Sequence, residues 1–449
     1  MEGLEISVVK LSELNNESRI EAEYFSKENL KLLANLSNYG CIPIFNVANS
    51  VTDGIHTSID YDENSSINLI SAGSPKENVF DLSRSVFISE KAHKENPRTA
   101  LRKNDVVIST VGTIGNCAVV DESILPANSD RHVGIVRLNV EKYSPYVLST
   151  FLLSKYGRMQ TLRESTGNVQ LSLFLYKIRE LLIPNFSDTF QSKIESLVKS
   201  AHAKLEESKS LYSQAEDLLL GELGLKDWQP KNTLHTTKKF SDFAQSGRLD
   251  AEYYQPKYDE IERELSKKNT LEISKVGQIC DKNFTPLDNV EYKYIELADI
   301  GTFGEITSCT TAFGSELPTR ARRIVHKGDV LISSIEGSLQ SCAIVTNEFD
   351  NALCSTGFYV MTPKKLNAES LLILLKTKVI QLLLKKGCSG TILTNISKDE
   401  FLKIKIPILP EQIQKKIASL IQQSFEFKAQ SKQLLEDAKR MVEEEIEKN

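Results

Sequence analysis

Two long segments of the chain carry apolar residues at steps of three and four. One lies between Phe190 and Leu220, and the other between Ile417 and Ile446. This spacing places the apolar side chains on one face of an α-helix. We therefore predict long helices over residues 187–224 and 409–449. Their seams are predicted to contain Ile194, Leu197, Leu205, Leu211, Leu218, Ile417, Leu420, Leu434 and Met441.

Each predicted seam is too wide for a helix that stands alone, so we expect coiled-coil packing. A helix rises about 1.5 Å per residue, so roughly 30 residues span about 45 Å. Gly221 and Gly224 are expected to end the first helix. A connector follows over residues 225–240, and it contains the single tryptophan, Trp228, and Pro230.

The sequence repeats itself. RIEAEYF at Arg19–Phe25 returns in the second half of the chain as RLDAEYY at Arg248–Tyr254. KNDVVIS at Lys103–Ser109 returns as KGDVLIS at Lys327–Ser333. Because a repeat of this length marks a duplicated structural unit, we predict two copies of one domain.

Later matches keep almost the same offset between the copies. Cys117 corresponds to Cys342, and Gly167 corresponds to Gly390. Within each copy, short β-branched runs alternate with Gly, Asn and Asp, which is typical of strands joined by turns. We therefore predict an α+β protein with these parts: a first domain over 1–186, a helix over 187–224, a connector over 225–240, a second domain over 241–408 and a helix over 409–449.

The composition is that of an ordinary soluble protein, with 40% hydrophobic and 26% charged residues and a net charge of −5. The longest apolar stretch, from Leu371 to Leu384, is interrupted by two lysines and is too short for a bilayer. The N-terminal segment lacks the pattern of a secretory signal. We expect a cytoplasmic protein that does not contact a membrane. An acidic chain binds nucleic acid poorly through net charge alone, so any DNA-reading surface is expected to be local.

Seven cysteines occur, an odd number without a Cys-x-x-Cys pair. This pattern argues against a disulfide framework and against a zinc knuckle. We interpret them as reduced thiols at Cys41, Cys117, Cys280, Cys309, Cys342, Cys354 and Cys388.

Sequence signals for catalysis are missing. The chain has no phosphate-binding Gly-x-x-x-x-Gly-Lys-Ser/Thr loop, no His-Glu-x-x-His pair and no Pro-Pro motif of the kind an amino-methyltransferase needs. Pro286, Asp288, Glu291 and Lys293 imitate a nuclease metal site, but its two carboxylates normally come from separate strands. The six histidines show no ligand spacing. We predict no catalytic residue, no metal site and no cofactor in this chain.

The order of motifs resembles the DNA specificity subunit of type I restriction-modification systems. The resemblance covers nearly the whole chain, including the LLLGELGLKDWQP connector at Leu218–Pro230 and IPILPEQIQKKI at Ile406–Ile417. Residues 183–194 of the first copy lack the Pro-Glu-Gln that the second carries at Pro410–Gln412. The resemblance implies two target recognition domains separated by two antiparallel coiled-coil helices with pseudo-twofold symmetry.

The same resemblance implies a function without catalysis. Each domain would read one half of a bipartite, asymmetric site in double-stranded DNA. Two modification subunits, which carry S-adenosylmethionine chemistry, and restriction subunits would be the partners. Two alternatives stay open. Activity of the isolated chain would favour a stand-alone nucleic-acid enzyme, and an assembled complex without sequence-specific binding would favour a coiled-coil scaffold.

Polar and basic residues near the predicted strands are the candidates for DNA contact. Arginine suits guanine, Asn and Gln suit adenine, and Lys, Arg, Ser and Thr suit phosphates. In the first copy the candidates are Arg98, Arg102, Lys103, Thr113, Asn116, Asn168 and Gln170. In the second they are Arg320, Arg322, Arg323, Lys327, Ser338, Gln340, Ser341, Thr391 and Asn395.

These candidates have plainer explanations too. A charge cluster is often a solvated surface, and small polar residues are common in turns. Arg19, Glu23, Arg248 and Glu252 of the Arg-acidic-Ala-Glu-Tyr box could contact DNA or a modification subunit. We favour a structural ion-pair and aromatic anchor that ties the box to the helices.

Overall fold

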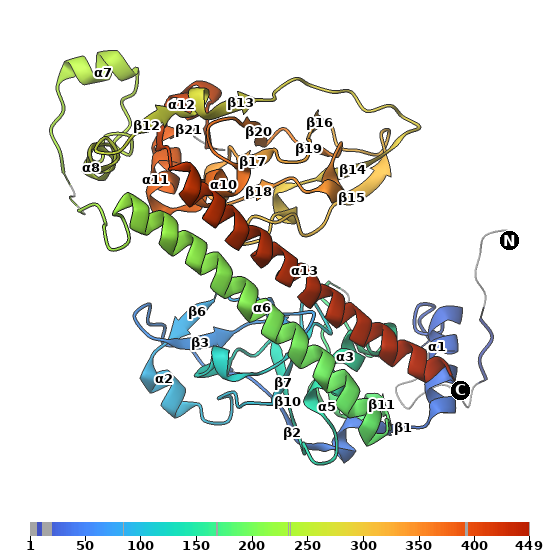
Figure 1. The fold of residues 1–449 in the computed structure, drawn as a ribbon. Helices are drawn as coiled ribbons and strands as arrows, with labels where there is room; N and C mark the ends of the chain where they lie inside the picture. The colour runs from blue at the N-terminus through green and yellow to red at the C-terminus, as the bar shows by residue number, and fades with distance from the viewer. Residues whose placement is uncertain are drawn as a thin grey trace. The chain divides into compact units, whose positions relative to one another are not determined.

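The computed structural model describes residues 7–10, 20–83, 85–167, 169–231, 233, 235–390 and 394–448. Its contacts divide the chain into two compact units (Figure 1). Unit 1 contains Met1–Leu205 and Lys428–Asn449, and unit 2 contains Glu206–Phe427. Two long helices, α6 (Asp188–Leu223) and α13 (Glu411–Glu447), contribute one half to each unit.

Unit 1 is built from short helices and strands that precede α6. In chain order they are α1 (Lys27–Tyr39), β1 (Cys41–Pro43), η2 (Ile44–Asn46), β2 (Ala48–Asp53), β3 (Ile67–Ile70), β4 (Pro75–Lys76), β5 (Val79–Phe80), β6 (Val86–Ile88), α2 (Glu90–Glu95), β7 (Val106–Ser109), β8 (Cys117–Val119), η3 (Glu122–Ile124), β9 (Ala127–Ser129), β10 (Val133–Leu138), α3 (Pro145–Leu153), α4 (Lys155–Arg163), α5 (Leu175–Glu180) and β11 (Leu182–Pro184).

Unit 2 repeats this plan before α13. In chain order it contains α7 (Phe240–Ser246), α8 (Pro256–Leu265), β12 (Thr270–Glu272), α9 (Ile273–Val276), β13 (Gly277–Ile279), β14 (Glu291–Ile295), η4 (Leu297–Asp299), β15 (Thr310–Phe313), β16 (Ala321–Ile324), β17 (Val330–Ser333), η5 (Glu336–Ser338), β18 (Cys342–Ile344), η6 (Asn347–Phe349), β19 (Leu353–Ser355), β20 (Phe358–Pro363), α10 (Ala368–Lys376), α11 (Lys378–Gly387), β21 (Cys388–Ser389), β22 (Asn395–Ile396), α12 (Lys398–Lys403) and β23 (Lys405–Pro407).

The sheets confirm the internal repeat and the α+β class. Unit 1 has an antiparallel sheet in the order β2-β10-β7-β8, and unit 2 has the same order in β13-β20-β17-β18. A second sheet contains the parallel pair β3/β9 in unit 1 and the parallel pair β14/β19 in unit 2. The pair β1/β11 recurs as β12/β23 with the same register. The chain therefore contains the same folding pattern twice, once in each unit.

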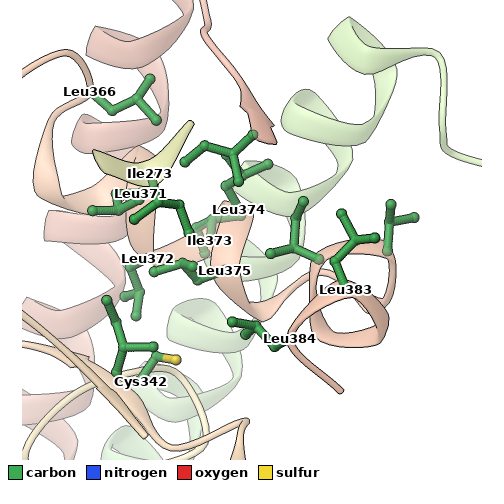
Figure 2. Packing of buried hydrophobic residues seen from close by; sticks show 14 of the residues in the cluster. Ile273, Cys342, Leu366, Leu371, Leu372, Ile373, Leu374, Leu375, Leu383 and Leu384 are labelled. Atoms are coloured by element: carbon green, nitrogen blue, oxygen red, sulfur yellow. The ribbon is translucent and has the colours of Figure 1, made fainter. Parts of the chain in front are cut away.

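The core of each unit lies around the inner strands of its four-stranded antiparallel sheet. All four residues of β7 and all four of β17 are buried. In unit 2, residues 371–375 of α10 are all at most 1% exposed, and Figure 2 shows them among the neighbouring apolar side chains. A helix that is apolar on every side is a core helix. The matching helix α3 is likewise buried at all nine positions.

The apolar stretch from Leu371 to Leu384 is thus two core helices. Thr377 separates α10 from α11, and its hydroxyl accepts a hydrogen bond from the amide of Ile380 at 3.4 Å. None of the helices in the described ranges is long and apolar enough to cross a membrane. All seven cysteines are free thiols, as predicted, and four of them are buried.

The repeated Lys-Asn/Gly-Asp motif is a turn that leads into an inner strand of this sheet. Asp105 accepts the amide of Arg102 at 2.9 Å, and Asp329 accepts the amide of His326 at 2.9 Å. The residue before each aspartate has positive φ, 71° at Asn104 and 87° at Gly328, which suits Asn and Gly. Burial raises the pKa of Asp105, although the Arg137 guanidinium opposes that shift.

The Arg-acidic-Ala-Glu-Tyr box of unit 2 forms an ion pair and an aromatic contact, and it bonds outside the box to α8 and to the end of α11. Arg248 pairs with Asp250 at 2.6 Å, and its guanidinium lies 4.7 Å from the ring centroid of Tyr253. Arg248 also donates to the carbonyl of Cys388 at the end of α11, at 2.8 Å. Glu252 accepts a hydrogen bond from Tyr258 of α8. In the first copy, Arg19 lies outside the described residues.

The first long helix ends at Leu223, one residue before the predicted end. Gly224 has φ 63°, its amide donates to Gly221 at 3.0 Å, and the amide of Leu225 donates to Leu220 at 2.8 Å. This is the hydrogen-bond pattern of a glycine C-cap. Gly224 therefore ends the helix, whereas the prediction for Gly221 was wrong because it lies within the last turn. The predicted domain limits remain a prediction, since the contacts divide each long helix between units.

Small residues occupy the centre of the helix seam. Of the predicted seam residues, Ile194 and Ile417 are fully buried, and the other seven are partly buried. The buried small positions recur every seven residues, as expected for a coiled coil. They are Ala201, Ser208 and Ala215 in α6, and Ser424, Ser431 and Ala438 in α13.

Each unit buries its own part of this seam. In unit 1, Val198 packs in the same core cluster as Ala438 and Val442. In unit 2, Ala215 and Leu219 share a cluster with Ile417. The Ser424 hydroxyl donates to the carbonyl of Ser208 at 2.8 Å, and the two hydroxyl oxygens are 3.0 Å apart. The small side chains permit this close approach of the two backbones.

One glutamine joins each long helix to its core. Gln191 accepts the amide of Ser144 at 2.9 Å, and Gln414 accepts the amide of Asn367 at 2.9 Å. Ser144 and Asn367 are the N-caps of α3 and α10. The two glutamines keep the same offset as Gly167 and Gly390, so the repeat continues into the long helices.

We predict that Ser208→Leu destabilises unit 2. Ser208 is 0% exposed and its hydroxyl lies 3.0 Å from that of Ser424, so the larger side chain overpacks the seam and removes this contact between the two hydroxyls. Overpacking of this kind costs about 1–3 kcal/mol. Thermal and urea unfolding of the full chain measure the effect. Ser213→Leu on the exposed side of α6 is the matched control and is expected to change stability by less than about 0.5 kcal/mol. Equal stability of the two variants would contradict the seam.

Candidate nucleic-acid interface

The predicted loops of unit 1 meet at one end of its antiparallel sheet. The amide of Thr110, just after β7, donates to His132, just before β10, at 3.0 Å. The carbonyl of Thr110 accepts the amide of Leu173 at 2.9 Å, and Val111 forms a bridge with Ser172. We call residues 53–54, 110–116, 131–132, 166–167 and 169–172 the loop end of unit 1.

Unit 2 has the same construction. The amide of Ser334, just after β17, donates to Gly357 at 2.9 Å, and its carbonyl accepts the amide of Ile396 at 2.8 Å. The amide of Glu336 also donates to Thr394 at 3.0 Å. Residues 334–341, 356–357 and 394–395 form the loop end of unit 2. The corresponding positions of the two units thus carry equivalent hydrogen bonds between their backbones.

The polar candidates of unit 1 differ in how free their side chains are. Thr113 is exposed and donates to the carbonyl of Ala72 at 3.1 Å, and Gln170 is exposed. Asn116 is half-buried and accepts a hydrogen bond from Arg158 at 2.5 Å. Asn168 lies outside the described residues. Thr113 and Gln170 are therefore the accessible candidates of this group, while Asn116 holds its own loop.

Arg98 reaches the loop end but uses its donors within the protein. Its guanidinium pairs with Asp53 at 3.1 Å and donates to the carbonyl of Gly54 at 3.2 Å, while 54% of the side chain stays exposed. Burial alone would raise the pKa of Asp53, but hydrogen bonds from His56 and Arg98 lower it. The pair links the end of β2 to the loop after α2 that carries Arg98.

The remaining basic candidates of unit 1 lie at the opposite end of the sheet. Arg102 and Lys103 precede β7, whereas Thr113 and Asn116 follow it. A strand of four residues spans about 13 Å at 3.3 Å per residue. Lys103 pairs with Glu122 at 2.7 Å, also at that opposite end. Lys327 holds the same position before β17 in unit 2. The structure thus separates these residues from the loop ends.

The three candidate arginines of unit 2 make different contacts. Arg320 is exposed and pairs with Glu296 at 2.9 Å, while its carbonyl accepts the amide of Thr356 at the loop end. Arg322 donates to the carbonyl of Thr319 at 2.8 Å. Arg323 is half-buried and donates to the carbonyl of Phe358. Arg320 and Arg322 thus keep donors for a ligand, whereas Arg323 supports the start of β20.

The polar candidates of unit 2 include both structural and accessible groups. The Ser338 hydroxyl lies 2.9 Å from that of Ser333, and Ser341 accepts the Ser333 amide through its carbonyl. Gln340 and Asn395 are exposed. Thr391 lies outside the described residues. Ser338 and Ser341 therefore shape the loop, and Gln340 and Asn395 face solvent.

The structure also places two residues in the loop end of unit 1 that the sequence analysis missed. Arg131 is exposed and His132 half-exposed between β9 and β10. The matching hydrogen bonds align His132 with Gly357, and hence Arg131 with Thr356, although the paired residues share neither charge nor shape. The register of β10 against β7 locates these two residues, whereas their residue types do not.

The nuclease-like residues take other roles. Lys293 donates to the carbonyl of Glu348 at 2.9 Å and lies 5.5 Å from the ring centroid of Phe349. The carbonyl of Asp288 accepts the hydroxyl of Ser315 at 3.3 Å. Across the described ranges, no group of three or more His, Cys, Asp or Glu side chains is placed to hold a metal ion.

Comparison with known proteins identifies related chains. A family model described as "Type I restriction modification DNA specificity domain" matches residues 266–439. No curated protein gave a match. The crystal structure of a type I restriction-modification S subunit from M. genitalium is 13% identical with a TM-score of 0.44, and the alignment covers 91% of this chain and 94% of that chain.

Two further structures align over similar lengths. The HsdS subunit from Thermoanaerobacter tengcongensis is 15% identical with a TM-score of 0.29, over 91% of this chain and 95% of that one. A chain from a structure titled for complex assembly and conformational transition of the type I R-M system is 17% identical with a TM-score of 0.29, over 91% and 96%.

The family match falls on unit 2 and most of α13. It begins just after α8 and contains β17, β20 and the whole loop end of that unit. Unit 1 repeats the strand order of the four-stranded antiparallel sheet and the backbone hydrogen bonds of the loop end. Residues 266–439 of this chain are therefore similar to the DNA specificity domain of type I restriction-modification systems.

Proposed function

We propose that each loop end reads one half of a bipartite, asymmetric sequence in double-stranded DNA. The observation that carries this proposal is the pair of backbone hydrogen bonds at Thr110, repeated at Ser334. They hold three loops together in each unit, while the side chains on those loops differ between units. Two loop ends with the same backbone arrangement and different side chains are suited to recognise two different half-sites.

We assign base contacts to the exposed polar groups of the loop ends. Thr113 and Gln170 serve unit 1, and Arg320, Gln340 and Asn395 serve unit 2. Gln and Asn match the donor and acceptor edge of adenine, and arginine matches guanine. The side chains of Arg98, Asn116, Ser338 and Arg323 instead hold the loops in place. Arg102, Lys103 and Lys327 receive no base contact because a whole strand separates them from the loop ends.

The catalytic chemistry is assigned to other subunits. We propose that two modification subunits supply S-adenosylmethionine-dependent adenine methylation and that restriction subunits supply cleavage, while this chain selects the site. What supports this division is the match of residues 266–439 to the DNA specificity domain family, together with the absence of catalytic motifs from the sequence. The proposal places the complex in the cytoplasm with the DNA that it modifies.

The isolated chain is expected to transfer no methyl group and to cut no DNA. Adding the cognate modification subunits and S-adenosylmethionine should produce adenine methylation at one sequence. Incorporation of labelled methyl groups into plasmid DNA, followed by mapping of the modified bases, measures both states. Methyl transfer by the isolated chain would contradict the proposed division of labour.

The two units are expected to act as separate readers. Replacing the segment from Arg248 to Lys403 with the corresponding segment of a relative should change one half of the methylated sequence and leave the other half intact, because each unit carries its own sheets and loop end. Mapping the methylated sites of the hybrid complex gives the answer. A simultaneous change in both halves would show that the units do not read independently.

Arg322→Ala is expected to weaken DNA binding by the assembled complex. The loss is about 1–3 kcal/mol for one sequence position if Arg322 contacts a guanine. If it contacts a phosphate, the loss is uniform across sequences and the dependence of affinity on salt becomes shallower by about one unit. A salt titration with specific and unrelated duplexes separates the two contacts. Unchanged affinity at every salt concentration would leave Arg322 as a solvated surface residue.

A further inference from the structure

The backbone at Arg131 is fixed from both sides at the centre of the loop end of unit 1. On one side, the amide of His132 donates to the Asp130 carboxylate at 2.8 Å, and the amide of Asp130 donates to Ile70 at 2.9 Å. On the other, the His132 carbonyl accepts the amide of Thr110. The Cα atom of a residue in such a segment is already fixed. The backbone therefore loses little conformational freedom when the side chain binds a ligand.

The guanidinium of Arg131 keeps most of its donors available. Its Nε donates to Nε2 of His132 at 3.3 Å, and Arg131 is exposed. In the part of the chain that the structure describes, no carboxylate forms an ion pair with it. The neighbouring arginines differ, because Arg98 pairs with Asp53 and Arg158 pairs with Glu77. An arginine offers five N–H donors in a planar fork, and the contact with His132 uses only the inner one.

The second unit does not repeat this group. Thr356 stands at the equivalent position, with its amide bonded to the carbonyl of Arg320 at 3.0 Å. Its side chain is exposed but carries no charge and only one hydroxyl. The two loop ends therefore differ in charge and in number of hydrogen-bond donors at a position where their backbones carry equivalent hydrogen bonds.

We propose that Arg131 is a specificity-determining residue that reads a guanine in the half-site of unit 1. The proposal rests on the proposed DNA-reading function of the loop ends. The two outer nitrogens of the guanidinium match N7 and O6 of guanine in the major groove, and a bidentate contact needs a fixed orientation. The backbone bonds and the contact with His132 supply that orientation. A phosphate contact would not require it, since a single charge suffices there.

The test uses the complex assembled from the full chain and its modification subunits. Methylation rates are measured on duplexes with the preferred site and with each base pair of both half-sites changed in turn. Arg131→Ala should reduce the preference for guanine at one position of one half-site by about 5- to 150-fold. Arg131→Lys, which keeps the charge but loses the planar fork, should lose most of the same preference. Preferences in the other half-site should stay unchanged.

Lys94→Ala is the matched control. Lys94 is an exposed basic residue of the same unit, paired with Glu90 at 2.9 Å on α2, and its removal lowers the charge by the same amount. The rate and sequence preference of this variant should equal those of the wild type. Assembly with the modification subunits, followed by size-exclusion chromatography, and the thermal unfolding midpoint show whether each variant retains its fold.

Three results would overturn the assignment of Arg131. They are an equal loss of rate on all sequences that lysine restores, an unchanged preference in both half-sites, and a change spread over both half-sites. Failure of the proposed function looks different, because the wild-type complex itself would then show no half-site preference. A wild-type complex that reads a bipartite site, together with an Arg131→Ala complex that reads it identically, would reject the role of Arg131 alone.

Discussion

The arrangement of each loop end depends on one backbone position, Thr110 in unit 1 and Ser334 in unit 2. The amide of this residue bonds to the segment before the neighbouring strand of the sheet, which is β10 in unit 1 and β20 in unit 2. Its carbonyl bonds to the segment before a short helix, which is α5 in unit 1 and α12 in unit 2. These bonds use main-chain groups that every residue except proline provides. These backbone bonds can therefore form with different residues in the loops, and the two copies can present different polar groups on the same backbone arrangement.

The architecture around this backbone arrangement was largely predictable from sequence because it depends on periodic and repeated patterns. The three- and four-residue spacing predicted long helices over 187–224 and 409–449, and the structure has them over Asp188–Leu223 and Glu411–Glu447. The serines at the centre of the seam were missed, since a search for apolar residues passes over Ser208 and Ser424. Gln191 was missed because the motif around Gln414 is not repeated around it.

The candidate site was harder to predict because residue type alone does not show which donors a fold leaves free. The cluster from Arg98 to Lys103 reads as one basic patch in the sequence, yet the chain carries its members to opposite ends of β7. Arg98 and Arg323 are engaged by Asp53 and by the carbonyl of Phe358. Arg131 drew no attention because it is a single arginine without a counterpart in the second copy. Only the strand registers bring it between the loops.

The central claim, that two copies of one scaffold read two different half-sites, is tested most directly by a map of methylated adenines in the host genome with and without this gene. Single-molecule sequencing reports the modified bases. The account predicts that deletion removes one motif made of two unlike halves separated by unread base pairs. Loss of a continuous palindromic motif, or no change in the methylation pattern when the modification subunits are expressed, would contradict it.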